Sequence, residues 1–396
     1  MAIDFGTNLV ARWPSARAEH VTLLKKAGVQ AVLTDAPDAE FEKAARAAGI
    51  EYALESAAAI PGSFGDGLWP GVRSQGRRGD ADLAGASREP WVDANGWRYA
   101  VERALHPERA PVGTFAHRDK SQIVPYSTLE TALIEARVDG GNFVLDLEPG
   151  YREALLSGDA KAAAAWESLG KTAAWLSANR ALFAYPADPT ITALAADGFS
   201  EELVNLLFRR NASPAVAPAS APPEPAPEKI RALVAAALPS LPPKALEHAR
   251  AGAIVVTDAK PDPAWKVLRE DTDRIVYTVG KGQVVAYREE ISDPNEFALD
   301  VIDLVTHRRR SCRLWNALSS IPRAVIPGRG EMLISVINYG SETNNEIQAR
   351  VQGRYTRAML LRPESEPVPL KVSGRGSMTE IFLPGLRRVA AVRFSA

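Results

Sequence analysis

Short apolar runs alternate with amphipathic stretches through the first half of the chain. Each apolar run has the length of a strand, and each amphipathic stretch repeats its apolar positions at helical spacing. Strands joined by helices at short intervals predict a parallel sheet, because parallel strands need crossover connections. The expected strands cover residues 5–13, 31–35, 50–56, 110–115, 142–147 and 181–185, and the expected helices cover 14–24, 39–48, 95–105, 128–137, 158–179 and 199–208.

The pattern changes at a segment rich in Pro and Ala, residues 211–227, which predicts an extended linker or a long surface loop. Beyond it, a mixture of helices and strands predicts a small α/β domain. Its expected helices cover 228–238, 244–250 and 296–308, its first strand covers 253–258, and a hairpin over 274–288 turns at Gly280-Lys281-Gly282.

After Pro327 no helix is expected. Short strand candidates recur between Gly, Pro, Asn and Ser, which is typical of a small antiparallel β sandwich. The predicted organisation is a barrel-like β/α domain (1–210), a linker (211–227), an α/β domain (228–322) and a C-terminal β sandwich (323–396).

Composition excludes several classes of protein. Among the 396 residues, 47 Lys and Arg nearly balance 48 Asp and Glu, so no global charge favours nucleic acid or an anionic membrane surface. The single cysteine, Cys312, excludes an intrachain disulfide, and the five scattered histidines predict neither a metal site nor a cofactor site. No apolar stretch has the length of a membrane helix, and no export signal is expected at the start as written. The compartment stays undetermined, because a leader could have been removed, and a homo-oligomer stays among the alternatives.

The stretch from 141 to 150 is unusual, because an apolar strand there ends in two acids. Asp146 and Glu148 lie two residues apart and share one face of a strand, and Pro149 favours extended geometry at Glu148. Since α/β proteins place their sites at the carboxyl ends of strands, this pattern predicts a carboxylate site. The structural alternative is that both acids accept hydrogen bonds from backbone amides in the turn and at the start of the following helix.

The order of these domains resembles that of multidomain bacterial glycoside hydrolases. The segments 253–258, 280–287 and 293–298 look like the later part of the glutamine-amidotransferase-like domain that follows the barrel in family 42 β-galactosidases, and 333–339 and 386–392 are similar to their closing β sandwiches. The resemblance implies a (β/α)8-like barrel, or a degenerate version of one, and a saccharide ligand. One departure is clear: the Asn-Glu pair that supplies the acid in the barrel of this family occurs here only as Asn345-Glu346, in the terminal β domain.

Glycoside hydrolysis needs one protonated carboxyl group and one ionised carboxylate, for which Asp146 and Glu148 are the expected pair. An equal alternative is that one acid of the pair comes from another strand, with Asp35, Glu55 and Asp93 as candidates. Sugar rings also favour flat aromatic surfaces with polar rims. The expected substrate-binding residues lie at strand ends or in loops: Trp13, Asp35, Glu55, Trp91, Asp93, Asn95, Trp97 and Tyr151. Each has a structural alternative, such as a helix cap for Asp93 and core packing for the tryptophans. The alternative function is a non-catalytic carbohydrate-binding or assembly protein with a degenerate barrel, and a third is an unrelated α/β enzyme.

Overall fold

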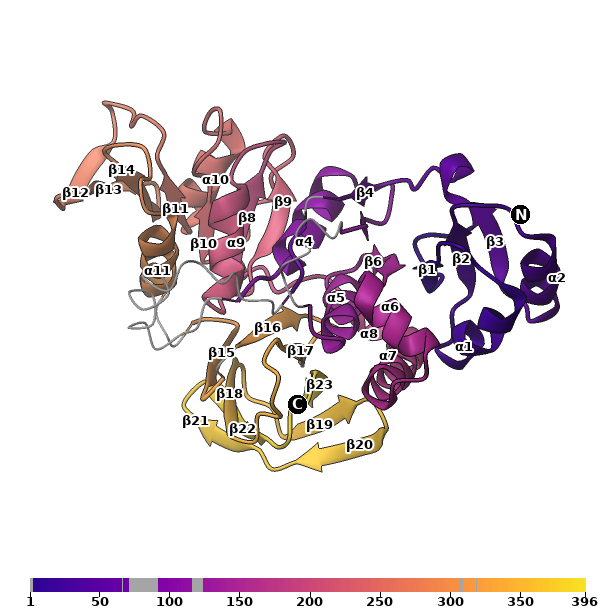
Figure 1. The fold of residues 1–396 in the computed structure, drawn as a ribbon. Helices are drawn as coiled ribbons and strands as arrows, with labels where there is room; N and C mark the ends of the chain where they lie inside the picture. Colours follow the sequence, from indigo (N-terminus) through magenta and orange to yellow (C-terminus); the bar gives the residue numbers. More distant parts are fainter. Residues whose placement is uncertain (1–2, 66, 71–91, 116–123, 306–308, 318) are drawn as a thin grey trace, which may run out of the picture.

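The computed structural model describes residues 3–65, 67–70, 92–115, 124–305, 309–317 and 319–396. Three regions follow one another along the chain (Figure 1). They are an N-terminal β/α region, a middle α/β region and a C-terminal region of antiparallel strands. The sequence predicts this order of regions.

The N-terminal strands are all parallel and form two small sheets. One has the order β3-β2-β1-β7 and the other β4-β5-β6. Only Val144 separates β6 from β7, so the two sheets continue into each other through the strand that the sequence predicts at 142–147. Within the described residues no ladder joins β3 to β4, and a closed barrel is not confirmed. The strand bounds are β1 (Val10–Arg12), β2 (Ala31–Thr34), β3 (Glu51–Leu54), β4 (Ser63–Phe64), β5 (Val112–Gly113), β6 (Asn142–Phe143) and β7 (Leu145–Asp146).

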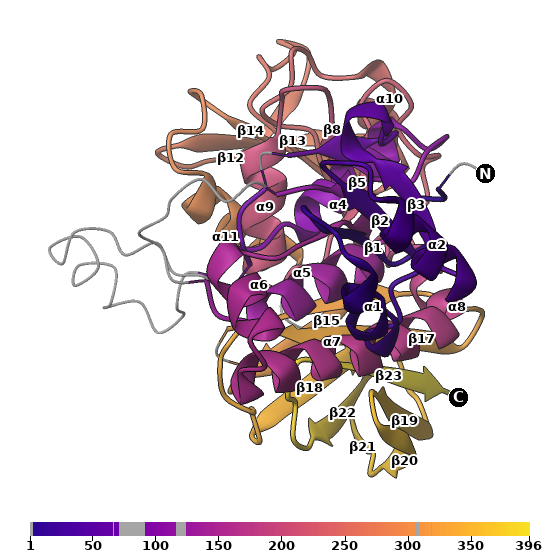
Figure 2. The same ribbon diagram turned by 45° about the vertical axis from the view of Figure 1, so that its right-hand side comes forward.

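Helices follow most of these strands and cover them. Their bounds are η1 (Ala18–His20), α1 (Val21–Lys26), α2 (Ala39–Ala47), η2 (Glu55–Ala57), α4 (Gly96–Leu105), α5 (Ser127–Val138), α6 (Pro149–Leu156), α7 (Ala160–Ala178) and α8 (Arg180–Phe183). The strand expected at 181–185 is therefore wrong: α8 begins directly after α7, and its Phe183 packs against Trp175. Helix α5 is buried along almost its whole length, as expected for a helix enclosed on all sides. Figure 2 shows α5 and α7 between the parallel strands and the C-terminal region.

The middle region is one sheet of seven strands with the order β12-β13-β14-β11-β10-β8-β9. Helices α9 and α11 cover one face and α10 covers the other. The bounds are β8 (Ile191–Ala195), α9 (Glu201–Arg209), β9 (Ala215–Pro218), β10 (Ala232–Val234), α10 (Pro243–Ala251), β11 (Ile254–Thr257), β12 (Lys266–Glu270), β13 (Arg274–Val279), β14 (Gly282–Tyr287) and α11 (Pro294–Val305). The predicted hairpin is confirmed: β13 and β14 pair directly, and Gly280 at the turn has a φ of 62°.

The sheet of the middle region begins earlier than the expected boundary at 210. β8 and α9 belong to it, and the Pro-rich segment 211–227 contributes β9 because its backbone pairs with β8 at the sheet edge, where Pro218 is tolerated. The helix expected at 228–238 is wrong, because β10 lies inside the sheet between β8 and β11. Its alanines favour a helix, but pairing on both sides overrides that propensity.

The C-terminal region is built from two antiparallel sheets, as predicted. One has the order β15-β18-β22-β21 and the other β16-β17-β23-β19-β20, and their apolar faces share one core. This region begins at Cys312, before the expected boundary at 323. The bounds are β15 (Cys312–Trp315), β16 (Ser320–Val325), β17 (Glu331–Asn338), β18 (Ile347–Gln352), β19 (Arg357–Arg362), β20 (Ser365–Leu370), β21 (Ser373–Arg375), β22 (Met378–Leu383) and β23 (Val389–Ser395).

Gly170 marks the close approach of α7 to the end of α1. A Cβ atom at Gly170 would lie 2.8 Å from the Cα of Ala27, so Gly170→Ala is expected to destabilise the protein by about 1–3 kcal/mol. The gain of about 1 kcal/mol in helix propensity offsets only part of this. Urea unfolding measures the difference. Gly374→Ala is the matched control, since its Cβ would meet nothing within 4 Å, and an equal loss in both variants would contradict the packing argument.

Candidate functional site

Four parallel strands end at one edge of the N-terminal sheet, and polar side chains at or just after the strand ends lie along it. Arg12 ends β1 and lies beside Asp146 of β7 in the ladder. Arg12 forms two ion pairs, from Nε to Glu55 Oε1 at 2.6 Å and from Nη1 to Asp146 Oδ2 at 2.7 Å. We call Arg12, Asp35, Glu55 and Asp146 the strand-end rim. Three of these residues are among the predicted site residues, and Arg12, which joins two of them, is not.

The ion pairs favour the charged form of Arg12. Burial alone would lower the pKa of Arg12, but the carboxylates of Asp146 and Glu55 outweigh it and raise that pKa. Side chains at this position remain partly open to solvent, with exposed fractions of 22% for Arg12, 41% for Glu55 and 18% for Asp146. The arrangement therefore presents a guanidinium held between two carboxyl groups at an accessible edge.

Asp35 follows β2 and lies on the same edge. Its Oδ1 accepts a hydrogen bond of 2.6 Å from the backbone N–H of Ser15, and this bond lowers the pKa of Asp35. Ser15 has a φ of 49°, a value that is uncommon for residues other than glycine. Asp35 thus holds the loop after β1 in a fixed conformation while it remains exposed.

Trp13 lies below this edge, in the core. It is fully buried, its Nε1 donates to His20 Nδ1 at 3.1 Å, and the guanidinium of Arg152 covers its ring at 5.4 Å. The expected role of Trp13 as a sugar platform is therefore not supported, because no face of the ring is open. The exit loop from β1 places Trp13 inward against Trp166.

Glu148 and Tyr151 serve the start of α6. Glu148 is the N-cap, and its Oε2 accepts from the N–H of Tyr151 at 3.0 Å, as in the structural alternative for this residue. Tyr151 is buried and stacks on Tyr126, with ring centroids 4.3 Å apart. The structure therefore uses both residues to position α6, and it does not open the ring of Tyr151 to a ligand.

A second polar cluster lies inside the protein, where α4 and α5 meet the C-terminal region. Glu135 of α5 is fully buried and accepts hydrogen bonds from the N–H of Asn95, the N–H of Gly96 (2.9 Å), Asn95 Nδ2 (3.0 Å) and the hydroxyl of Tyr339 (2.9 Å). Burial raises the pKa of Glu135 to about 7, although these hydrogen bonds lower it. We call Asn95, Glu135, Asp139, Arg323 and Tyr339 the interior junction.

Asn95 belongs to this interior junction, and Trp97 lies beside it. The side chain of Asn95 also pairs with the backbone of Leu68, and Trp97 Nε1 donates to Ala94 O at 3.1 Å. Asp93 forms an ion pair of 3.5 Å with Arg209 of α9, and Trp91 lies outside the described residues. The expected grouping of Asp93, Asn95 and Trp97 is present, but these residues connect the three regions of the fold.

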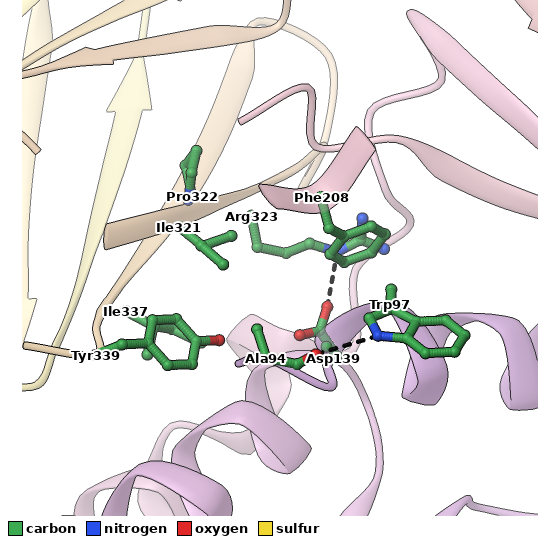
Figure 3. A pocket seen from close by; sticks show the side chains of 10 residues that line it. Ala94, Trp97, Asp139, Phe208, Ile321, Pro322, Arg323, Ile337 and Tyr339 are labelled. Atoms are coloured by element: carbon green, nitrogen blue, oxygen red, sulfur yellow. Dashed lines mark hydrogen bonds and ion pairs between the residues drawn. The ribbon is translucent and has the colours of Figure 1, made fainter. Parts of the chain in front are cut away.

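The cavity at the interior junction is too small for a sugar. Figure 3 shows Asp139 and Arg323 facing each other across it, with Trp97 on one side and Tyr339 on the other. Its volume is about 10 Å³, roughly the space of one water molecule. The lining residues are Ala94, Gly96, Trp97, Asp139, Phe208, Ile321, Pro322, Arg323, Ile337 and Tyr339. The strand-end rim, which is partly exposed, is therefore the better candidate for ligand binding.

Other chemistries find little support in the part of the chain that the structure describes. It contains no group of three or more His, Cys, Asp or Glu side chains arranged to hold a metal ion. Cys312 is buried in β15 within the C-terminal region, and burial raises the pKa of its thiol to about 12. Among the described helices, none is long and apolar enough to cross a membrane.

Comparison with solved structures shows a likeness of fold. No family model and no curated protein matches the sequence. The structure is similar to that of α-L-fucosidase isoenzyme 2 from Paenibacillus thiaminolyticus, with a TM-score of 0.52 and 9% sequence identity over 96% of this chain and 79% of that chain. The chain has a glycoside-hydrolase-like fold.

Two β-galactosidases are also similar in outline. The one from Rahnella sp. gives a TM-score of 0.48 at 10% identity, over 98% of this chain and 63% of that chain. A GH42 beta-galactosidase from G. stearothermophilus gives 0.47 at 12% identity, over 78% of this chain and 58% of that chain. This chain spans less than two thirds of the length of either β-galactosidase.

Sequence reasoning missed Arg12 and the charged members of the interior junction. Arg12 is the last residue of a strand in the sequence Val10-Ala11-Arg12, so its position at a strand end was a usable signal. Glu135 and Asp139 lie in and just after a helix whose other residues are mostly apolar. A buried acid in such a helix needs a partner, but only the structure identifies Tyr339 and Arg323 as the partners.

Proposed function

We propose that this protein binds a saccharide at the strand-end rim of its glycoside-hydrolase-like fold. The observation that carries the proposal is the chain of ion pairs from Glu55 through Arg12 to Asp146, at the carboxyl ends of parallel strands. Sugar hydroxyls both donate and accept hydrogen bonds, so alternating carboxylates and guanidinium groups recognise them through charge-assisted bonds. The position matches the edge at which α/β folds of this type bind their ligands.

Binding without hydrolysis is the form of the proposal that the geometry favours. A glycosidase needs one carboxyl group that donates a proton to the leaving oxygen. Asp146 is paired with Arg12, and Glu148 accepts from the amide of Tyr151, so both carboxylates act as acceptors. The proposed role is therefore recognition of a sugar by a protein with a degenerate catalytic edge.

Hydrolysis by Asp146 and Glu148 is the second candidate. It is favoured by the place of Asp146 at the end of a strand, two residues before Glu148, and by the ion pair that orients the carboxylate of Asp146 toward Arg12. For hydrolysis, Glu148 would have to give up the hydrogen bond that it accepts from the N–H of Tyr151, bind a proton and donate that proton to the leaving oxygen.

A binding experiment followed by an activity assay separates these two candidate functions. Calorimetric titration with a panel of mono- and disaccharides, led by fucosides and galactosides, is expected to show binding that Asp146→Asn or Arg12→Gln weakens about tenfold to hundredfold, the worth of one charge-assisted hydrogen bond. Glu247→Gln, on the exposed side of α10, is the matched control and should bind like the wild type.

The same protein samples are then assayed on aryl glycosides. Turnover that is lost in both Asp146→Asn and Glu148→Gln would establish the catalytic candidate in place of recognition alone. Saccharide binding that neither Asp146→Asn nor Arg12→Gln alters would overturn the assignment to the strand-end rim, as would the absence of binding to every sugar tested.

A further inference from the structure

The outer face of one sheet in the C-terminal region carries aromatic and basic side chains together. On β15, β18 and β22 the core-facing residues alternate with residues that point outward. The ladder pairs Trp315 with Gln348 and Gln348 with Phe382, so these three form one outward row across the sheet. The next outward row contains Arg313, Arg350, Glu380 and Ser373. We call these two rows the outer sheet face.

This face is open. Phe382 is 55% exposed, a large value for an aromatic side chain, and Gln348 beside it is also exposed. The opposite sheet is the one that packs against the rest of the protein, since Ile321, Ile337, Tyr339 and Val389 belong to the core of the N-terminal region. Figure 1 shows β15, β18, β22 and β21 on the side of the sandwich away from α5 and α7.

The arginines of the outer sheet face are held in place by Trp315. The guanidinium of Arg313 lies 4.7 Å from the ring centroid of Trp315 and that of Arg350 lies 4.6 Å from it. Stacking on an indole leaves the N–H groups of a guanidinium directed outward in its plane, where they match a carboxylate or a sulfate. Arg350 already has an acid partner in Glu380, at 2.6 Å from Nε to Oε1, whereas the described residues provide none for Arg313.

The charge of the outer sheet face favours an anionic ligand. Two arginines, Arg313 and Arg350, lie in these rows and Glu380 is the one acid in them, while the exposed Arg375 lies in the next row, paired with Met378. This local excess of positive charge contrasts with the net charge of -1 for the whole chain. A surface with such an excess attracts polyanions more strongly than the protein as a whole.

The spacing of the aromatic side chains favours an extended chain. Trp315 and Phe382 lie two strands apart, which separates them by about 10 Å at the usual distance between strands. That distance is close to the span of two sugar residues in a polysaccharide. One sugar ring can therefore lie on Phe382 while an acidic group two residues along the chain reaches the guanidinium of Arg313.

We infer that the outer sheet face is a second saccharide site, specific for an acidic polysaccharide that bears carboxylate or sulfate groups. The choice of a polysaccharide over another polyanion rests on the proposed function. The description of the surface as basic and aromatic is independent of that function. The site lies on a different region of the fold from the strand-end rim, so each can bind in the absence of the other.

The test uses the full chain in native gels that contain dextran sulfate, polygalacturonate or neutral dextran. The acidic polymers are expected to retard the wild type and neutral dextran is not, and 0.5 M NaCl should abolish most of the retardation because it screens exposed charges. Arg313→Gln and Phe382→Ala are each expected to weaken binding about fivefold to tenfold, as loss of a stacked or charge-assisted contact does. Trp315→Ala should weaken it at least as much.

Arg357→Gln is the matched control, because it removes the same charge from an exposed position on the opposite sheet. Arg313→Gln is expected to leave the calorimetric binding of mono- and disaccharides at the strand-end rim unchanged, so failure at the strand-end rim and failure at the outer sheet face are read separately. Equal loss in Arg357→Gln and Arg313→Gln would overturn the site, and so would retardation by neutral dextran. Binding to single-stranded poly(U) without binding to either acidic polysaccharide would replace the saccharide by a nucleic acid.

Discussion

Replacing Glu135 by alanine is expected to lower the free energy of unfolding by about 3–5 kcal/mol. The carboxylate accepts from two backbone N–H groups, from Asn95 Nδ2 and from the hydroxyl of Tyr339, and its side chain is fully buried. Alanine would leave these donors without their acceptor inside the protein. The loss should be visible in urea unfolding followed by circular dichroism.

The cost of Glu135→Ala should also depend on pH. Burial raises the pKa of Glu135 from 4.5 to about 7, so the folded protein binds this proton more tightly than the unfolded chain does. The stability from this group is therefore fully present below pH 4.5 and is lost as the pH rises through 7. The difference in free energy of unfolding between wild type and Glu135→Ala should be largest at pH 5. It should shrink by at most about 3 kcal/mol toward pH 8.

Glu153→Ala is the control for this prediction, because Glu153 is an exposed glutamate on α6. Its effect is expected to stay within about 0.5 kcal/mol, as for most surface substitutions. A cost below about 1 kcal/mol for Glu135→Ala at pH 5 would mean that water replaces the carboxylate without penalty. A cost that grows with rising pH would contradict the direction assigned to its pKa.

The parts of the fold that local pattern controls were predictable from the sequence. The hairpin of β13 and β14 turns where Gly280 permits a positive φ, and the strand at 142–147 stands out because an apolar run ends in Asp146. The antiparallel strands after Pro327 are separated by residues that favour turns. In each of these cases the side chains nearby in sequence decide the conformation.

The segments whose structure was predicted wrongly depend on partners far away in sequence. Residues around β10 are rich in alanine and have helical propensity, yet they form a strand because β8 and β11 supply hydrogen bonds on both sides. Segment 211–227 has the composition of a linker, but its backbone completes the edge of the same sheet. Neither pairing leaves a local signal, since a sheet is stabilised by contacts across strands.

The same distinction applies to the site. The acids Asp35, Glu55 and Asp146 could be placed at strand ends, and the structure locates them on one edge. Arg12 becomes their partner only through the parallel register of β1 and β7, which joins residues 134 positions apart. The role predicted for Trp13 also depends on distant contacts, because an aromatic residue after a strand can turn inward or outward. Here it turns inward and packs on Trp166.

Replacing Arg323 by methionine is expected to destabilise the protein by about 3–5 kcal/mol, the usual effect of breaking one buried ion pair from one side. Arg323 Nε lies 3.2 Å from Asp139 Oδ1, and the two side chains are 5% and 4% exposed. Its Nη1 also donates to Pro214 O at 2.6 Å, so the substitution removes a partner from the middle region as well. Methionine retains apolar contact with Phe208, over whose ring the guanidinium lies at 5.2 Å.

A double-mutant cycle with Asp139→Asn tests this ion pair. If the cost of Arg323→Met arises from a buried carboxylate without a partner, the double variant should be more stable than the sum of the two single losses by at least about 1 kcal/mol. Burial raises the pKa of Asp139 to about 6, and Arg323 holds it below the value that burial alone would give. Without Arg323 this pKa should rise further, so Arg323→Met should regain stability relative to the wild type as the pH falls from 8 to 5. Strictly additive losses that do not vary with pH would show instead that Arg323 stabilises the junction of the three regions through its contacts with Pro214 and Phe208.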